Sequence, residues 1–182
     1  MISVPGYGKL DLICESANSL VFRSSRVSDG LPVVLKLLRD DFPSPEELAR
    51  YWQEYKIVSL LQGQPGIIKA YGTQEYKNTL FIVLEDFGAE SLRYWMVHKD
   101  FTIQEKLSLS IRMAECMDTV HQAKIIHKDI NPGNFVYNPD TDTLKIIDFG
   151  ISTQLSRESM ELRSPNVLEG TRSTSLPSRP AG

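Results

Sequence analysis

The hydrophobic pattern changes near Leu84, and no other feature of the sequence constrains the fold as strongly. Short runs with β-propensity precede that point and are separated by polar or Gly/Pro segments: Leu10 to Cys14, Leu20 to Arg23, Val33 to Leu38, Ile67 to Tyr71 and Leu80 to Leu84. Later, apolar residues recur at helical spacing, at Leu107, Ile111, Ala114, Met117 and Val120. This order predicts an α+β fold in which a mostly antiparallel sheet precedes a helical part.

Length, charge and cysteine content narrow the class of protein. A chain of 182 residues is long enough for one sizeable core and too short to require two independent domains. A net charge of -3 and a pI of about 5.6 lack the basic excess of nucleic-acid binders, so we expect no nucleic acid partner. No apolar run approaches the ~18 residues of a membrane helix, so we expect no membrane segment. Cys14 and Cys116 show neither disulfide nor zinc spacing, which fits a cytoplasmic protein.

Two helices have strong start signals. Ser44 is placed to cap the first helix, Pro45 suits its first helical position, and Glu47 completes a capping box. Thr102 and Glu105 form a second capping box directly before the long apolar stripe. We therefore predict one helix inside the strand-rich part and one long helix after it.

A β-hairpin is expected after the long helix, and two polar motifs flank it. Its strands are predicted at 134–137 and 144–147, with turn-forming residues between them. The first motif, HKDINPGN, occupies 127–134, and the second, DFG, occupies 148–150. In this order and at this separation, they resemble the H-R-D-x-x-x-x-N catalytic loop and the D-F-G of eukaryotic-type serine/threonine protein kinases. The resemblance implies a two-lobed protein-kinase-like fold with ATP and Mg²⁺ as cofactors.

The resemblance also implies roles for three residues of these motifs. Phosphoryl transfer needs one carboxylate to orient the attacking hydroxyl, while other oxygen ligands hold Mg²⁺ against the phosphates. By resemblance, Asp129 is the catalytic base. Asn134 and Asp148 are then the metal ligands.

A lysine and a glutamate are expected to pair near the phosphates. The sequence VVLK, which ends at Lys36, resembles the kinase strand whose lysine contacts the α and β phosphates of ATP. Glu54 lies in the first predicted helix. A lysine on that strand must find an anion or leave the cleft, so a carboxylate from the helix is its expected partner. We therefore count both residues among the catalytic ones.

The segment between the two parts resembles the kinase hinge. It runs from an apolar strand into the polar, glycine-containing link LEDFG. By resemblance, Leu84 backs the adenine pocket, and the backbone of Glu85 and Phe87 hydrogen-bonds adenine. An edge strand that enters a loop would have the same composition. The residues expected above and below the adenine ring are Val21, Val34 and Val136.

The resemblance covers about residues 7 to 171. It divides the chain into an N-lobe at 7–84, a hinge at 85–90, a partial C-lobe with the start of the activation segment at 91–171, and a tail at 172–182 that we expect to be disordered. The phrases HKDINPGN, LEDFG, IIDFGIST and NVLEGT are similar to the kinase domain that opens large bacterial, cyanobacterial-type sensor proteins, where an ATPase module, a GAF domain and a histidine kinase follow. Other domains of such a protein are the implied partners. The sequence names no protein substrate.

Several positions depart from the family pattern. Cys14, Ser16 and Ser19 stand at the glycine positions of the Gly-rich loop, so phosphate coverage should be looser, although the serine hydroxyls can still donate to phosphate. Lys128 replaces the arginine of H-R-D and meets a phosphate as a point charge, which argues against control by activation-loop phosphorylation. Asn131 stands where serine/threonine kinases carry a lysine that touches the transferred phosphate.

The family pattern also stops before the end of the chain. Kinases continue from Gly-Thr into A-P-E and further helices, whereas Arg172 onward shows neither Pro-Glu nor apolar periodicity. We therefore expect the substrate platform to be absent. We also expect the apolar face of the helix at 103–123 to be partly uncovered.

Three functions are compatible with these residues. The first is an ATP- and Mg²⁺-dependent protein kinase in which Asp129 orients a Ser or Thr hydroxyl for attack on the γ-phosphate. The second is an inactive kinase fragment or pseudokinase that binds nucleotide or a partner without turnover. The third is a small-molecule kinase of the aminoglycoside or choline type, which shares His-x-Asp and the later metal aspartate. It ranks last because it gives no reason for Phe149 or for Glu169 to Thr171.

Overall fold

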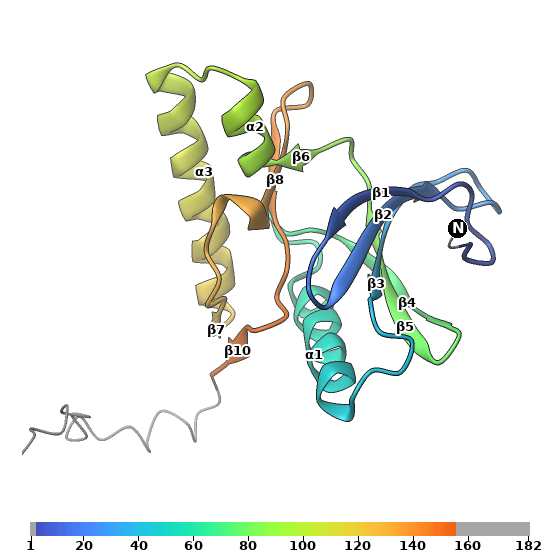
Figure 1. Ribbon diagram of the computed structural model, residues 1–182. Helices are drawn as coiled ribbons and strands as arrows, with labels where there is room; N and C mark the ends of the chain where they lie inside the picture. Colours follow the sequence, from blue (N-terminus) through green and yellow to red (C-terminus); the bar gives the residue numbers. More distant parts are fainter. Residues whose placement is uncertain (1–2, 156–182) are drawn as a thin grey trace, which may run out of the picture.

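The computed structural model of the protein describes residues 3–155. It confirms the α+β class: a sheet with one helix forms the first part, and a mainly helical region with short strands forms the second (Figure 1). The predicted disordered tail at 172–182 and positions 156–171 of the expected partial C-lobe lie outside the described residues.

Five antiparallel strands form the sheet of the first part, in the order β1-β2-β3-β5-β4. They are β1 (Asp11–Glu15), β2 (Ser19–Ser25), β3 (Pro32–Leu38), β4 (Ala70–Tyr76) and β5 (Thr79–Glu85). β3 lies at the centre and is buried from Leu35 to Leu38. A charged residue on this part of β3 therefore needs a partner within the protein.

One predicted strand, Ile67 to Tyr71, begins later than expected, at Ala70. Ile67 instead forms a parallel bridge with Ile146 of the second part, and the N–H of Ile68 donates to the carbonyl oxygen of Ile146 at 3.3 Å. The apolar residues at the start of this run are thus buried between the two parts. Hydrophobicity alone does not distinguish this kind of burial from burial in a sheet.

The helix α1 (Pro45–Leu61) starts as predicted. The hydroxyl of Ser44 accepts the N–H of Glu47, and the carboxylate of Glu47 accepts the N–H of Ser44, which completes the capping box. The buried residues of α1 are Tyr51, Glu54, Ile57, Val58 and Leu61. Glu54 is thus a carboxylate in an otherwise apolar and aromatic stripe, and its burial needs a counter-charge.

The second part combines two helices with short strands. Its elements are β6 (Glu90–Ser91), α2 (Leu92–His98), α3 (Ile103–Gln122), β7 (Ile125–Ile126), the 3-10 turn η1 (Pro132–Asn134), β8 (Phe135–Asn138), β9 (Thr143–Ile146) and β10 (Thr153–Gln154). The expected hairpin is confirmed as β8 paired with β9, and β6 joins β8 on the other side. The capping box of Thr102 and Glu105 opens α3 as predicted.

The helix α2 has no counterpart among the predicted elements. It has 7 residues, and Leu92 is its buried residue, so no apolar periodicity marks it. Its start is fixed by Ser91, whose hydroxyl accepts the N–H of Tyr94 at 3.1 Å. The indole N–H of Trp95 donates to the carbonyl oxygen of Tyr137 in β8 at 2.9 Å, which holds α2 beside the hairpin.

The helix α3 buries only part of its predicted apolar stripe. Met117 and Val120 are buried, whereas Leu107 and Ile111 are 61% and 53% exposed. Ile103, at the first position of the helix, is 84% exposed. The expected, partly uncovered apolar face is therefore present among the described residues.

One large core connects the two parts. It includes Val58 of α1, Ile82 of β5, Val120 of α3, Ile146 of β9 and Phe149. Because these residues pack in a single cluster, α1 is held against the second part as well as against the sheet. Within residues 3–155, no helix has the length and apolarity needed to cross a membrane.

Gly66 provides a test of how closely the two parts pack. Its φ is +74°, and an added Cβ would lie 2.3 Å from the sulfur of Cys116 on α3. We expect Gly66→Ala to lower the free energy of unfolding by about 2 kcal/mol or more, from left-handed backbone strain together with overpacking. Urea denaturation measures the change. Gly63→Ala is the control, because its φ of +88° carries the strain without a neighbour within 4 Å. Equal losses would show that the contact with Cys116 is unimportant.

Candidate active site

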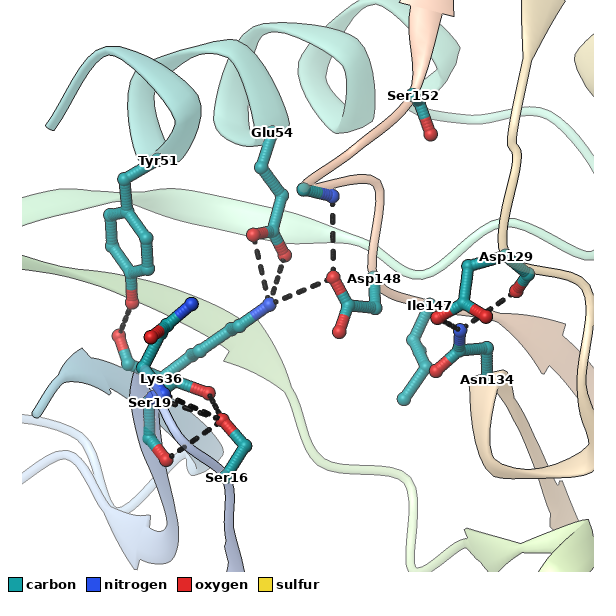
Figure 2. A network of polar contacts seen from close by, with 12 residues as sticks. Ser16, Ser19, Lys36, Tyr51, Glu54, Asp129, Asn134, Ile147, Asp148 and Ser152 are labelled. Atoms are coloured by element: carbon teal, nitrogen blue, oxygen red, sulfur yellow. Dashed lines mark hydrogen bonds and ion pairs between the residues drawn. The ribbon is translucent and has the colours of Figure 1, made fainter. Parts of the chain in front are cut away.

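Lys36, Glu54 and Asp148 form an ion network between β3, α1 and the segment after β9 (Figure 2). Nζ of Lys36 lies 2.6 and 2.8 Å from the two carboxylate oxygens of Glu54 and 3.2 Å from Oδ1 of Asp148. The side chains of Lys36 and Glu54 are 11% and 6% exposed, whereas that of Asp148 is 44% exposed. The structure thus brings together three predicted residues, with the pair buried and Asp148 at the open end.

Burial and charge compete in this network. Burial by itself would lower the pKa of Lys36, but the attraction of Glu54 and Asp148 prevails and raises it above its ordinary value. Burial raises the pKa of Glu54 despite the attraction of Lys36. Burial also acts to raise the pKa of Asp148, but the charge and hydrogen bond of Lys36 hold it below its usual range. Lys36 is therefore a permanent cation beside an ionised Asp148 at neutral pH.

Two side chains next to Glu54 fix the position of α1. The hydroxyl of Tyr51 donates to the backbone carbonyl oxygen of Lys36. Gln53 Nε2 donates to the carbonyl oxygen of Ser152 at 2.7 Å, and the hydroxyl of Ser152 donates to the carbonyl oxygen of His127 at 3.1 Å. The helix that carries Glu54 is thus fastened to both β3 and the segment after Gly150.

Two neutral amides hold the carboxylate of Asp129. Asn134 Nδ2 donates to the backbone oxygen of Asp129 at 2.8 Å and to its Oδ2 at 2.9 Å. Asn131 Nδ2 donates to Oδ1 of Asp129 at 2.9 Å. Because these donors carry no charge, they orient the carboxylate without neutralising it. Asp129 itself is exposed to solvent and can meet an incoming group.

His127 connects the two loops that carry Asp129 and Asp148. Its Nε2 lies 3.1 Å from the carbonyl oxygen of Ile147, and its Nδ1 accepts the N–H of Asp129 at 3.3 Å. These partners require the neutral tautomer with the proton on Nε2. The imidazole is buried and meets the ring of Phe149 edge-on, with centroids 4.9 Å apart. His127 is therefore a packing residue that sets the spacing of the two loops.

Two residues in these loops adopt the left-handed backbone region. Lys128 has φ of +67° and Asp148 has φ of +62°, at a cost of about 1–3 kcal/mol each. The side chain of Lys128 is held by the hydroxyl of Thr153, and Oδ1 of Asp148 accepts the N–H of Gly150 at 3.2 Å. The surrounding contacts thus maintain turns that aim the side chains of 129 and 148.

A cavity of about 200 Å³ lies between the β1–β2 turn, α1 and the two loops. Its walls include the predicted residues Ser16, Ser19, Lys36, Glu54, Asp129 and Asp148, together with Asn18, Leu38, Glu47, Arg50, Tyr51, Gly150 and Ile151. The predicted Val21, Val34, Leu84, Glu85, Phe87, Asn134 and Val136 are not in these walls. The cavity therefore unites the charged and hydroxyl residues but does not extend to those expected around adenine.

The β1–β2 turn is closed by its own serines. Ser16 Oγ accepts the N–H of Ser19 at 3.0 Å, and the two hydroxyl oxygens lie 2.9 Å apart (Figure 2). The N–H of Ser16 also donates to the carbonyl oxygen of Ser19 at 2.9 Å. At least one of the two hydroxyls is therefore already a donor within the turn.

The expected hinge is clamped by residues that sequence reasoning missed. Arg23 Nε donates to Asp86 at 2.8 Å, and its other nitrogens reach the carboxylate of Glu90 at 3.1 Å and the carbonyl oxygen of Ala89 at 2.9 Å. Arg23 lies on β2, more than sixty residues earlier in the chain. Only the fold brings it to this segment.

Two further contacts tie the hinge to the β8–β9 hairpin. Lys145 pairs with the carboxylate of Glu85, and Asn138 Nδ2 donates to the carbonyl oxygen of Phe87 at 2.5 Å. The N–H of Glu85 donates to the carbonyl oxygen of Lys69 at 3.0 Å. Some of the backbone groups expected to meet adenine are therefore already bonded within the protein. Sequence reasoning also missed Asn138. Its side chain is buried, and a buried amide needs several hydrogen-bond partners.

The residues present fit Mg²⁺ only together with phosphate oxygens. Within residues 3–155, no group of three His, Cys, Asp or Glu side chains gathers as a complete metal site. Asp148 offers Oδ2 at the open end of the network, and no described residue donates to Oδ1 of Asn134. Mg²⁺ is commonly held by one or two protein oxygens plus substrate phosphates, which is the set available here.

The family model and the similar proteins all point to the same family. Residues 7–174 match the family model described as protein kinase domain. The chain is 28% identical over 169 residues to Casein kinase I homolog 1 of Saccharomyces cerevisiae, covering 87% of this chain and 30% of that protein. It is 26% identical over 168 residues to a probable serine/threonine-protein kinase of Clostridium perfringens, covering 91% and 24%. A stress-activated protein kinase of Caenorhabditis elegans is 30% identical over 158 residues, covering 84% and 33%. The chain thus spans about a third or less of the length of these relatives.

Proposed function

The chain belongs to the protein kinase domain family, and from this premise we propose that it transfers the γ-phosphoryl group of ATP to Ser or Thr hydroxyls of proteins. The observation that supports this most directly is Lys36, which is shared between buried Glu54 and Asp148 and faces the cavity that Asp129 also lines. A cation, a metal-binding carboxylate and an orienting carboxylate around one cavity meet the needs of phosphoryl transfer.

Each charged residue then has one task. Lys36, held in place by Glu54, binds the α and β phosphates and neutralises part of their charge. Asp129 accepts a hydrogen bond from the acceptor hydroxyl and directs it at the γ-phosphate, while the amides of Asn131 and Asn134 keep its carboxylate in one orientation. Positioning of this kind, together with electrostatic stabilisation, accounts for most of the rate enhancement in phosphoryl transfer.

The metal and the adenine ring are assigned to the remaining predicted residues. Asp148 and Asn134 would hold Mg²⁺, which would neutralise the charge that develops on the phosphates. The adenine is proposed to lie against Val21, Val34, Leu84 and Val136, with hydrogen bonds to the backbone of Glu85 and Phe87. These valines and Leu84 are half-buried, as a surface that a ligand completes would be.

The wider setting is part of the proposal. We assign 7–84 to the N-lobe, 85–90 to the hinge and 91–171 to the C-lobe, in a signalling protein of the bacterial sensor type. The motifs shared with that group support the assignment, and the partners would be its ATPase, GAF and histidine kinase domains. The free thiols of Cys14 and Cys116 fit a reducing cytoplasm.

One observation favours a second candidate, a pseudokinase that binds nucleotide or a partner without turnover. The turn at Ser16 and Ser19 is closed by its own hydrogen bonds, and neutral Asn131 stands beside Asp129. The first feature uses a hydroxyl donor within the turn, and the second puts a neutral amide where the family carries a cation near the transferred phosphate. ATP binding without transfer is the behaviour that separates this candidate from the first.

The metal assignment predicts that ATP affinity depends on Mg²⁺ through Asp148. We expect the wild-type chain to bind ATP more tightly with Mg²⁺ than without it, as measured by isothermal titration calorimetry. Asp148→Asn removes a charged oxygen that Mg²⁺ prefers, so this dependence should disappear. Asn tolerates the left-handed backbone at this position, so the fold should persist.

Asp140→Asn is the matched control, because Asp140 is exposed in the β8–β9 turn and should leave the Mg²⁺ dependence intact. If Asp148→Asn still responds to Mg²⁺, another carboxylate is the metal ligand. A wild-type chain that binds no ATP under either condition would contradict the proposed function itself.

A further inference from the structure

Two arginines among the described residues have no carboxylate partner there. Arg23, Arg26, Arg39 and Arg112 each form an ion pair with an aspartate or glutamate. Arg50 and Arg93 form no such pair within residues 3–155. Arg50 lines the cavity proposed to hold the nucleotide, where a cation can neutralise phosphate charge. Arg93 does not line that cavity and requires a different explanation.

Arg93 lies on α2 and reaches the loop that carries Asp129. Its Nη2 lies 3.3 Å from Oδ1 of Asn131. The guanidinium also lies over Gly133, where an added Cβ would be 3.6 Å from both its Nε and its Nη2. These are ordinary contact distances, so the guanidinium packs beside the backbone of Gly133. The cap at Ser91 and the bond from Trp95 to Tyr137 hold the helix that carries it.

A short chain of contacts connects Arg93 to Asp129. Asn131 accepts a hydrogen bond from Arg93 and donates one to Oδ1 of Asp129 at 2.9 Å. Asn131 and Arg93 are both absent from the walls of the nucleotide cavity, whereas Asp129 is one of them. Arg93 therefore reaches the neighbourhood of Asp129 through Asn131 and from outside the cavity walls.

We propose that Arg93 selects acceptor substrates that carry an anionic group, a carboxylate or a phosphate, next to the hydroxyl to be phosphorylated. The inference rests on the proposed function, because it takes Asp129 as the point at which that hydroxyl lies. Arg93 is then a specificity-determining residue for the acceptor.

The state of the guanidinium supports this role. A guanidinium has five N–H donors in a planar fork that matches carboxylate and phosphate, and Arg93 uses one of them on a neutral amide. The side chain is exposed, so an incoming anion can reach it. The nearest other cation of this loop, Lys128, is engaged by Thr153. Lys128 is exposed too and bonds one neutral group as Arg93 does, but only a guanidinium can meet a carboxylate or phosphate with a planar fork of donors.

Peptide binding to the 182-residue chain tests this proposal without requiring catalysis. Four fluorescent peptides share one central serine and differ in the flanking residues, which are glutamate, phosphoserine, glutamine or lysine. Fluorescence anisotropy gives the Kd of each for the wild type and for Arg93→Glu, Arg93→Lys and Lys106→Glu. Lys106 is exposed on α3 and undergoes the same change of charge at a distance from the loop.

We expect the wild type to bind both anionic peptides about tenfold or more tightly than the glutamine peptide. Arg93→Glu should lose this preference and bind the lysine peptide more tightly, while Lys106→Glu should match the wild type. Arg93→Lys should retain part of the preference, because lysine keeps the charge without the fork. A larger loss for the phosphoserine peptide than for the glutamate peptide would identify phosphate as the preferred anion.

Two results would overturn the proposal. One is equal binding of all four peptides by the wild type. The other is an equal loss for all peptides in Arg93→Glu, which would indicate a structural role. Mg-ATP binding measured on the same samples reports separately on the proposed function. A chain that discriminates the peptides but binds no nucleotide would contradict the proposed function alone, and the reverse result would contradict the Arg93 assignment alone.

Discussion

Replacing Lys36 by methionine is expected to abolish the thermal stabilisation of the protein by Mg-ATP. Lys36 is the cation that joins Glu54 to Asp148 beside the cavity, so its loss removes the group proposed to bind the phosphates. At an ATP concentration of 100 times Kd, binding contributes about 2.7 kcal/mol of stability, which a thermal shift assay detects as a rise in Tm. Lys77→Met is the control, because Lys77 is an exposed residue in an ion pair with Asp41.

The same substitution should also weaken the fold, and this effect can be separated from nucleotide binding. Without Lys36, Glu54 is left buried with no counter-charge, which costs about 3–5 kcal/mol. The double variant Lys36→Met/Glu54→Gln should recover most of that loss but no Mg-ATP stabilisation. A double variant that regains the ATP-dependent shift would refute the assignment of Lys36.

The pH dependence of the single variant has a definite sign. Burial raises the pKa of Glu54 even in the wild type, and Lys36 opposes that rise. In Lys36→Met the opposing charge is gone, so the folded protein binds a proton more readily than the unfolded chain does. The stability of the variant should therefore fall as the pH rises through the elevated pKa of Glu54 and be restored in acid.

Asp129→Asn is expected to lower the rate of phosphoryl transfer by about 10²–10⁴-fold with little change in ATP affinity. The amide can accept a hydrogen bond, but it cannot accept the proton of the acceptor hydroxyl. Asp129 lines the cavity, and the network around Lys36 does not include it. The protein is tagged in the cells that make it and purified from them. The rate at which it transfers radiolabelled γ-phosphate is then measured.

Asp118→Asn serves as the control for this experiment, because Asp118 is an exposed residue of α3. Equal transfer by the Asp129→Asn variant and the wild type would refute the role of Asp129. A wild-type protein that binds Mg-ATP but transfers no phosphate would favour the pseudokinase candidate.

The sequence predicts those elements whose signals are local. Both capping boxes occur where Ser44 and Thr102 place them, because a cap needs only residues three apart. The hairpin of β8 and β9 follows from its turn-forming residues in the same way. The short helix α2 could not be predicted, since it has almost no buried face, and Ile67 was assigned to a strand because burial between two parts leaves the same apolar pattern.

The residues of the candidate site also differ in whether local sequence signals mark them. Lys36 and Asp148 could be named because short motifs mark them, and Glu54 because it lies in the helix that follows the lysine strand. The structure brings these three together. Arg23 and Arg93 could not be named, because neither belongs to a motif. Arg23 contacts Asp86, 63 residues away in the chain, and Arg93 contacts Asn131, 38 residues away. Contacts of this kind depend on the path of the backbone, which local patterns do not encode.

Three residues within one turn of α1 make contacts in three directions. This arrangement links nucleotide binding to the anchoring of the segment after Gly150. Tyr51 bonds to β3, Glu54 bonds to the lysine of the network, and Gln53 bonds to the backbone at Ser152. A rotation of α1 would therefore break both the ion pair of Glu54 with Lys36 and the hydrogen bond that anchors the segment after Gly150. By thermodynamic reciprocity, a nucleotide that stabilised this position of α1 would strengthen the anchoring at Ser152 by the same factor by which the anchoring strengthens nucleotide binding.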